Sequence, residues 1–235
     1  EKLSDPKQAN TANEYILQWM SSPFSLIQSL QILSESNDPK VLNMVSRVAK
    51  DNILVNWMAY APQDRQDIRE TLEARLIEYR GDERVAQSLV FLVVLVVCKD
   101  WPHDWPAALD SFIGAAEHSA DIFNIVTQII SELIDNSFSS TWMTIVRKKE
   151  IQGILAKYNE KFIETLKNAY ENFGLDAISM GAVTLVTALC RICPMELLFS
   201  DDWLFKLLFE CAENTSNTDC IGNALENLLL KRSDG

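Results

Sequence analysis

Apolar residues recur at the three- and four-residue spacing of an α-helix along almost the whole chain. The interruptions carry signals for helix starts and ends. Asp38-Pro39 and Ala61-Pro62 place proline in a first turn, and Gly81-Asp82 and Phe173-Gly174 are short turns. The pattern predicts eleven helices, at about 7–21, 23–35, 39–57, 63–80, 83–100, 104–118, 120–136, 143–172, 175–193, 196–213 and 217–231.

The short joints between these helices predict the architecture. Successive helices with so little chain between them have to run antiparallel. A succession of helix pairs without a strand is typical of a helical repeat array, and the absence of a fixed-period signature disfavours tetratricopeptide and ankyrin repeats. We therefore expect an all-α fold, an α-solenoid of about five to six antiparallel HEAT-like helix pairs, in a single domain over residues 1–235.

Residues 89–98 are apolar throughout, and five of the ten are valines. Valine favours strands, but helical patterns flank the run on both sides, so a helix buried on several faces is the better interpretation. Such a helix either leaves an apolar stripe exposed to a partner or is covered completely by its neighbours. The sequence leaves both possibilities open.

Charge and cysteine content limit the kinds of partner and compartment. The net charge of −12 disfavours nonspecific binding to nucleic acid or anionic lipid and favours basic partners. The five cysteines are an odd number and lie mostly in apolar helical patterns, which predicts reduced thiols in the cytosol or nucleus. There is no signal-peptide pattern, and we expect a soluble chain without a membrane partner.

No residue constellation predicts catalysis. Cys190 and Cys193 have the spacing of a zinc-binding pair, but His103 and His118 are the only histidines and neither completes a ligand set. No phosphate-binding loop and no nucleophile–base pair is recognisable. We expect a binding protein without catalytic residues, metal or cofactor.

The helix predicted at 143–172 begins with three cations, Arg147, Lys148 and Lys149. Acidic residues interleave with the lysines that follow, which is typical of a solvated helix face. An RNA-contacting strip at Arg147–Lys149 is the alternative.

The turn after the valine-rich helix contains Trp101-Pro102 and Trp105-Pro106. A Trp-Pro-x-x-Trp-Pro motif between two solenoid helices resembles the exportin branch of the importin-β superfamily. Around it, Trp57, Ala61-Pro62-Gln63 and Ile68-Arg69 are similar to landmarks of that family in the same order. The run from Arg147 to Gln152 is similar to the pre-microRNA exportin in particular. We expect the four Trp-Pro residues to be structural, because proline ends helices and indoles fill seams between repeats.

This resemblance implies a function in nuclear transport. In the exportin branch the first helix of each pair is outer and the second is inner, and the N-terminal repeats bind the GTP form of the small GTPase Ran together with an RNA or protein cargo. A member of the family would move between nucleus and cytoplasm. The chain would be the N-terminal HEAT-repeat region of such a receptor, as a fragment or as a short exportin-derived protein.

The sequence departs from the family pattern on two predicted inner helices. One carries Arg47 and Lys50 in place of the family's usual glutamine and glutamate, and the next offers Ser88, Val90 and Leu95 in place of spaced polar residues. Because the contacting surface of Ran has much basic character, these changes weaken the case for Ran binding. The alternative is an exportin-derived scaffold that binds a short helical segment of a partner in its groove, without Ran.

Overall fold

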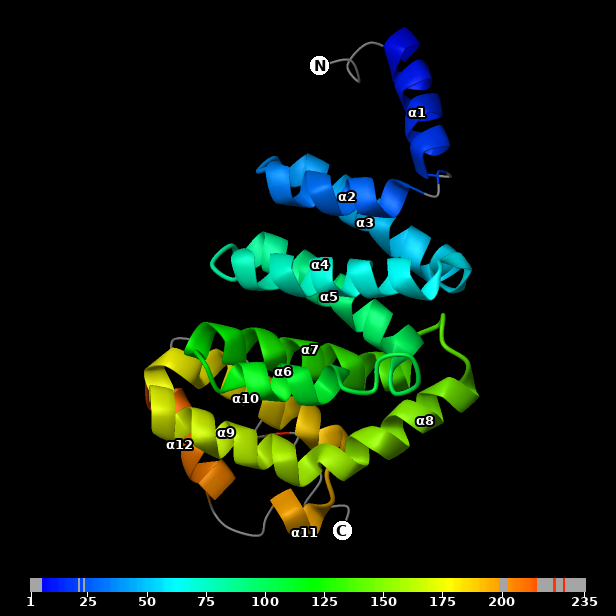
Figure 1. Ribbon diagram of the computed structural model, residues 1–235. Coiled ribbons are helices and arrows are strands. Elements are labelled where there is room, and N and C mark those ends of the chain that lie inside the picture. Colours follow the sequence, from blue (N-terminus) through cyan, green and yellow to red (C-terminus); the bar gives the residue numbers. More distant parts are fainter. Residues whose placement is uncertain are drawn as a thin grey trace. The chain divides into compact units, whose positions relative to one another are not determined.

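The computed structural model describes residues 6–20, 22, 24–198, 203–214, 222 and 226. Within these residues the chain is helical and contains no strand (Figure 1), which confirms the all-α prediction. The α-helices are α1 (Pro6–Met20), α2 (Ser25–Glu35), α3 (Pro39–Asn56), α4 (Pro62–Glu78), α5 (Glu83–Asp100), α6 (Ala108–Ala116), α7 (Ala120–Ser139), α8 (Ile145–Leu155), α9 (Asn159–Phe173), α10 (Leu175–Ile192), α11 (Met195–Leu198) and α12 (Trp203–Asn214).

The chain divides into two compact units, residues 1–99 and 100–235. In the first unit α2 packs on α3, and the connection between them is only three residues long, Ser36–Asp38. Residues 79–82 connect α4 to α5, and α2 contacts α4. First helices of successive pairs therefore stack on each other, as in a HEAT-like array.

The second unit repeats this arrangement with different helices. Here α6 packs on α7 and α9 packs on α10. Across the pairs, α6 contacts α9 and α7 contacts α10, so first and second helices form separate layers (Figure 1). The predicted HEAT-like pairing is confirmed by these contacts.

Side-chain caps fix several helix starts where the sequence places them. The Asp38 carboxylate accepts a hydrogen bond from the backbone nitrogen of Lys40 at 2.9 Å, and Pro39 occupies the first turn of α3. Ser119 caps α7 in the same way. Gly174, with φ of 76°, joins α9 to α10 in a left-handed backbone conformation that favours glycine.

The valine-rich run lies in the middle of α5, so the helical interpretation is confirmed and the strand alternative is wrong. Residues 92–98 are all buried, and so are Leu89 and Val90. The apolar stripe that the sequence left open is therefore covered within the protein. Only Phe91 within the run keeps part of its surface.

Two predicted helices are each divided. The long helix at 143–172 is α8 and α9, separated by a 3-10 turn at Ala156–Tyr158. At the break the Tyr158 ring packs on Trp101 and Phe162, and the Asn159 amide donates to the Ile192 carbonyl at 3.4 Å. The helix expected at 196–213 is likewise α11 and α12. The helix expected at 217–231 lies outside the described ranges apart from two isolated residues.

In the second unit α7 and α10 approach each other closely at Gly181. The amide of Asn124 donates to the Ala177 carbonyl at 3.0 Å, and its oxygen accepts from the Gly181 nitrogen at 3.0 Å. A Cβ atom on Gly181 would lie 2.4 Å from that oxygen and 2.8 Å from the Thr127 hydroxyl. Although α10 is long and apolar enough to cross a membrane, 56% of its residues are buried, and it packs on α7, α9 and α12 as a core helix does.

The close approach at Gly181 gives the first prediction. Gly181→Val should destabilise the chain by about 1–3 kcal/mol, because its side chain has no room against α7. Gly153→Ala is the matched control, since a Cβ there meets nothing within 4 Å, and it should stabilise by about 0.5–1 kcal/mol. Urea unfolding measures both, and equal stability of the two variants would contradict the close packing.

Candidate partner-binding groove

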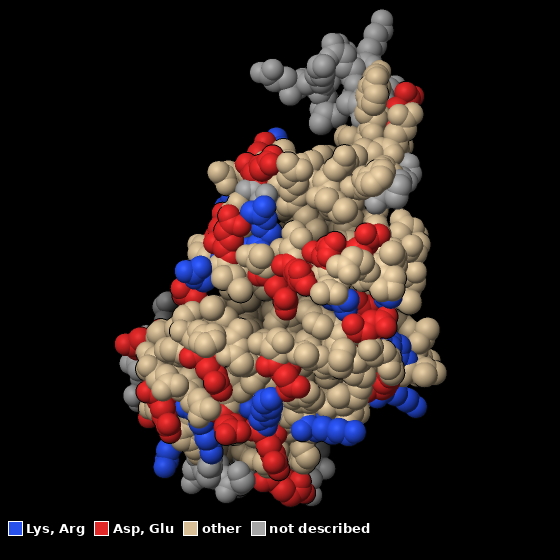
Figure 2. Space-filling model, in the orientation of Figure 1, with Lys and Arg blue, Asp and Glu red and all other residues tan. Residues whose placement is uncertain are grey.

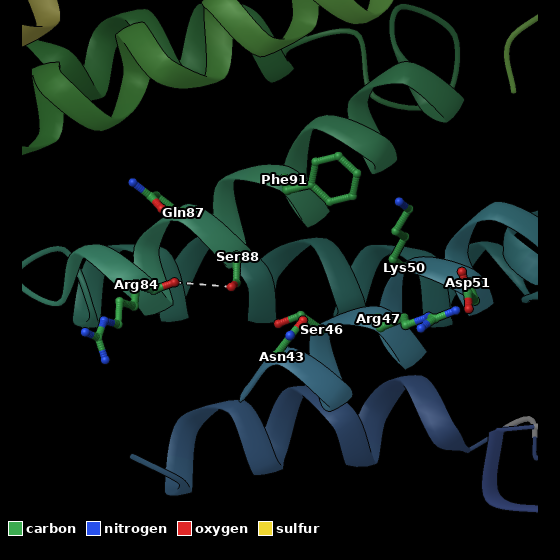
Figure 3. A pocket seen from close by; sticks show the side chains of 9 residues that line it. All are labelled: Asn43, Ser46, Arg47, Lys50, Asp51, Arg84, Gln87, Ser88 and Phe91. Atoms are coloured by element: carbon green, nitrogen blue, oxygen red, sulfur yellow. Dashed lines mark hydrogen bonds between the residues drawn. The ribbon is translucent and has the colours of Figure 1, made fainter. Parts of the chain in front are cut away.

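A polar groove in the first unit lies between α3 and α5, the second helices of their pairs (Figure 3). Its volume is about 670 Å³, within the range of ligand sites. The lining residues come from both helices: Asn43, Ser46, Arg47, Lys50 and Asp51 from α3, and Arg84, Gln87, Ser88 and Phe91 from α5. We call this site the α3–α5 groove.

Three cations and one carboxylate give the α3–α5 groove a net positive charge. Figure 3 places Arg84 at one end of the groove and Arg47 and Lys50 toward the other. The Lys50 ammonium lies 5.0 Å from the centre of the Phe91 ring, a cation–π contact between the two helices. The Ser88 hydroxyl donates to the Arg84 carbonyl at 3.2 Å and so does not extend toward a ligand.

The structure brings together three of the five residues that the sequence placed on the inner face. Arg47, Lys50 and Ser88 line the α3–α5 groove. Val90 and Leu95 do not, and they are only 3% and 0% exposed. Both side chains belong to the apolar core around α5, so they cannot contact a partner as the sequence predicted.

Three further lining residues of α5 were not predicted from the sequence. Arg84, Gln87 and Phe91 follow one face of the helix at the spacing i, i+3, i+7. Arg84 and Gln87 lie N-terminal to the apolar run, and Phe91 lies within it. Their helical spacing was the sequence signal for a shared face.

The Trp-Pro turn lies in the second unit, between the end of α5 and the start of α6. Trp101 is 1% exposed and meets the Tyr158 ring edge-on, with ring centres 6.1 Å apart. Trp105 is partly exposed and packs on Phe112 at 5.6 Å. Pro102 is partly exposed and Pro106 is exposed. These contacts within the unit agree with a structural role for the motif.

Arg147 binds the Trp-Pro turn to α8. Its guanidinium donates to the Trp101 carbonyl and to Glu150 Oε2, the latter at 2.5 Å. Glu150 Oε1 also lies 2.7 Å from His103 Nε2. The Arg147 hydrogen bond, assisted by the one from His103, lowers the pKa of the Glu150 carboxyl.

The three cations at the start of α8 do not share one exposed strip. Arg147 is held by the turn, and the Lys148 ammonium donates to the Phe138 carbonyl at 3.3 Å. Lys149 is exposed. Along α9, Lys161 pairs with Asp110 of α6 at 2.6 Å, and Figure 2 shows basic and acidic side chains interleaved over this face. The arrangement is that of a solvated face with a salt bridge between helices.

The thiols Cys98, Cys190, Cys193 and Cys211 are buried and are not joined in disulfides. Burial and the neighbouring Glu210 raise the pKa of Cys211 to about 11, which keeps it protonated. The described residues contain no group of three metal-ligating side chains. Cys220 lies outside the described residues.

Comparison with known proteins identifies the family. Residues 83–228, more than half of the chain, match the family described as Exportin 1-like protein. The chain is also 24% identical over 152 residues to Exportin-1 of Schizosaccharomyces pombe, which covers 60% of this chain and 14% of that relative. The chain belongs to the Exportin 1-like family and spans a small part of the relative it matches.

Family membership supports two of the sequence-based expectations. The resemblance to exportins inferred from the Trp-Pro motif is confirmed at the level of the family. Members of this family are binding proteins for transport and not enzymes, which agrees with the expected class. The match begins at Glu83, so it includes the α5 side of the α3–α5 groove but not the α3 side.

The burial of the two indoles predicts unequal effects of their removal. Trp101→Ala should destabilise the chain by about 3–5 kcal/mol, the range for large aromatic side chains removed from a core. Trp105→Ala should cost less, because that side chain remains partly exposed. Denaturant unfolding followed by circular dichroism tests this, and a larger loss for Trp105→Ala would contradict the assignment.

Glu150 predicts a pH dependence of stability. Its pKa in the folded chain is below its ordinary value, so the ionised carboxylate favours the folded state. This contribution is present above the unfolded pKa, near 4.5, and is lost as the pH falls through the lowered folded value. We expect Glu150→Gln to lose less stability than the parent chain as the pH falls from about 5 to about 3. If thermal unfolding shows the same loss of stability with falling pH in both proteins, this role of Glu150 is contradicted.

Proposed function

We propose that the chain is part of an exportin-like nuclear transport receptor that moves between nucleus and cytoplasm with a macromolecular cargo. The observation that carries this proposal is the match of more than half of the chain to the Exportin 1-like family. The stacked helix pairs of both units support it, because such arrays present long surfaces to other macromolecules. The Trp-Pro turn supports it as well, since its contacts suit the joint between two repeats.

The proposed partner is Ran in its GTP form. In the exportin branch the second helices of the N-terminal pairs bind this GTPase, and α3 and α5 are second helices here. The α3–α5 groove lies on these helices and offers a polar surface to a protein partner. A cargo would bind together with Ran, and the contacts of Arg147 within the second unit leave it unsuited to hold an RNA cargo.

A second candidate function is a scaffold that binds a segment of a partner protein without Ran. The three cations of the α3–α5 groove favour it, because they repel a basic surface such as that of Ran. An apolar helical segment is a poor occupant, since Val90 and Leu95 are buried and the groove is polar. The scaffold would therefore recognise its partner by charge.

Titration of Ran against the chain separates the two candidates. A transport receptor should bind GTP-loaded Ran with a dissociation constant of about 1 μM or lower, and GDP-loaded Ran at least tenfold more weakly, a difference of roughly 1.4 kcal/mol. Calorimetry with each nucleotide form measures both constants. Absence of binding to either form would contradict the transport function and leave the scaffold.

A further inference from the structure

The α3–α5 groove has a charge opposite to that of the chain as a whole. The sequence contains 33 acidic and 21 basic residues. In the groove the proportion is reversed, with Arg47, Lys50 and Arg84 against the single carboxylate of Asp51. A concentration of cations on an acidic protein attracts anions locally while the rest of the surface repels them.

Packing within the protein does not account for two of these cations, Arg47 and Arg84. On α3 the core positions are Leu42, Val45, Val48, Ala49 and Ile53, and Arg47 lies on the exposed side between them. Arg84 is likewise exposed, whereas its neighbours Val85 and Ala86 are buried. A carboxylate of a partner placed in the groove would gain favourable electrostatic contacts with these cations.

We propose that the α3–α5 groove binds an acidic segment of a protein partner, with carboxylates on Arg84 at one end and on Arg47 and Lys50 toward the other. The stretch of α3 that lines it, from Asn43 to Asp51, is about 12 Å long at 1.5 Å per residue. That length fits about four residues of an extended chain. The inference deepens the proposed function, since it names the chemistry of a partner that the receptor or scaffold binds.

The uncharged lining residues suit a polypeptide. The exposed amide of Asn43 can donate to and accept from a peptide backbone, and Phe91 offers an apolar ring beneath Lys50. The Gln87 nitrogen donates to Glu83 at 3.2 Å, and its oxygen can accept from a peptide nitrogen. A nucleic acid fits less well. Only three cations contact such a ligand, Asp51 opposes its phosphates, and the net charge of −12 repels a long polyanion.

The test is fluorescence anisotropy with a labelled eight-residue peptide of alternating glutamate and serine. A peptide with glutamine in place of glutamate is the matched control ligand. We expect the acidic peptide to bind at least tenfold more tightly, and the difference to shrink as the salt concentration rises through the physiological range. Equal affinity for the two peptides would overturn the proposal.

Charge-reversal variants test whether the acidic peptide binds in the α3–α5 groove. Arg47→Glu with Arg84→Glu should weaken the acidic peptide roughly tenfold or more. The control variant, Lys157→Glu with Lys206→Glu, makes the same change of charge at two exposed positions of the second unit and should keep most of the affinity. Thermal unfolding of both variants shows that they fold, and equal loss in the two would overturn the assignment to the groove. If the groove pair does not fold, Lys50→Gln takes its place and should weaken the peptide about threefold.

Two further measurements separate this inference from its alternatives. A single-stranded RNA octamer that binds more tightly than the acidic peptide, and loses affinity in the groove variant, would overturn a peptide site in favour of a phosphate site. GTP-dependent binding of Ran together with failure of the acidic peptide would leave the transport function standing and overturn only the groove assignment.

Discussion

Within each unit the helices have to bury their apolar faces on one another, because the described residues form no sheet or barrel that could cover them. In the second unit this requirement brings α7 and α10 so close that only glycine fits at position 181. In the first unit the same requirement places α2 against both α3 and α4. The positions that packing uses are thereby fixed, and the remaining faces are available to partners.

The polar side of α3 and α5 is what remains after packing in the first unit. Arg47 and Arg84 are exposed there, and Lys50 contacts the Phe91 ring. This is the surface that we propose for binding. The cations at the start of α8 differ, because Arg147 donates to the Trp101 carbonyl and to Glu150. Arginine therefore has a proposed binding role in the first unit and contacts within the protein in the second.

Local patterns were enough to predict most of the fold. Proline in the first turn located the starts of α3 and α4, and the helical context of the valine run predicted α5 correctly. The break between α8 and α9 could not be predicted, because Ala156–Tyr158 contains neither glycine nor proline and the turn depends on contacts of Tyr158 with distant rings.

The candidate site was predicted only in part, for the same physical reason. Arg47, Lys50 and Ser88 follow from helical spacing, since that spacing determines which residues share a face. Spacing does not determine which neighbour covers a face. Leu95 is four residues beyond Phe91 on one side of α5, yet Phe91 is partly exposed and Leu95 is completely buried. Burial of this kind depends on tertiary packing that a single sequence does not contain.

We propose that the cations of α3 and α5 hold carboxylates of a partner. Carbodiimide cross-linking of the acidic peptide, followed by mass spectrometry, tests this binding directly, because the reagent joins a lysine amine to a carboxylate that lies next to it. We expect Lys50 to carry the main cross-link, and the exposed Lys149 and Lys157 of the second unit to carry little. Cross-links spread equally over the three lysines would contradict it.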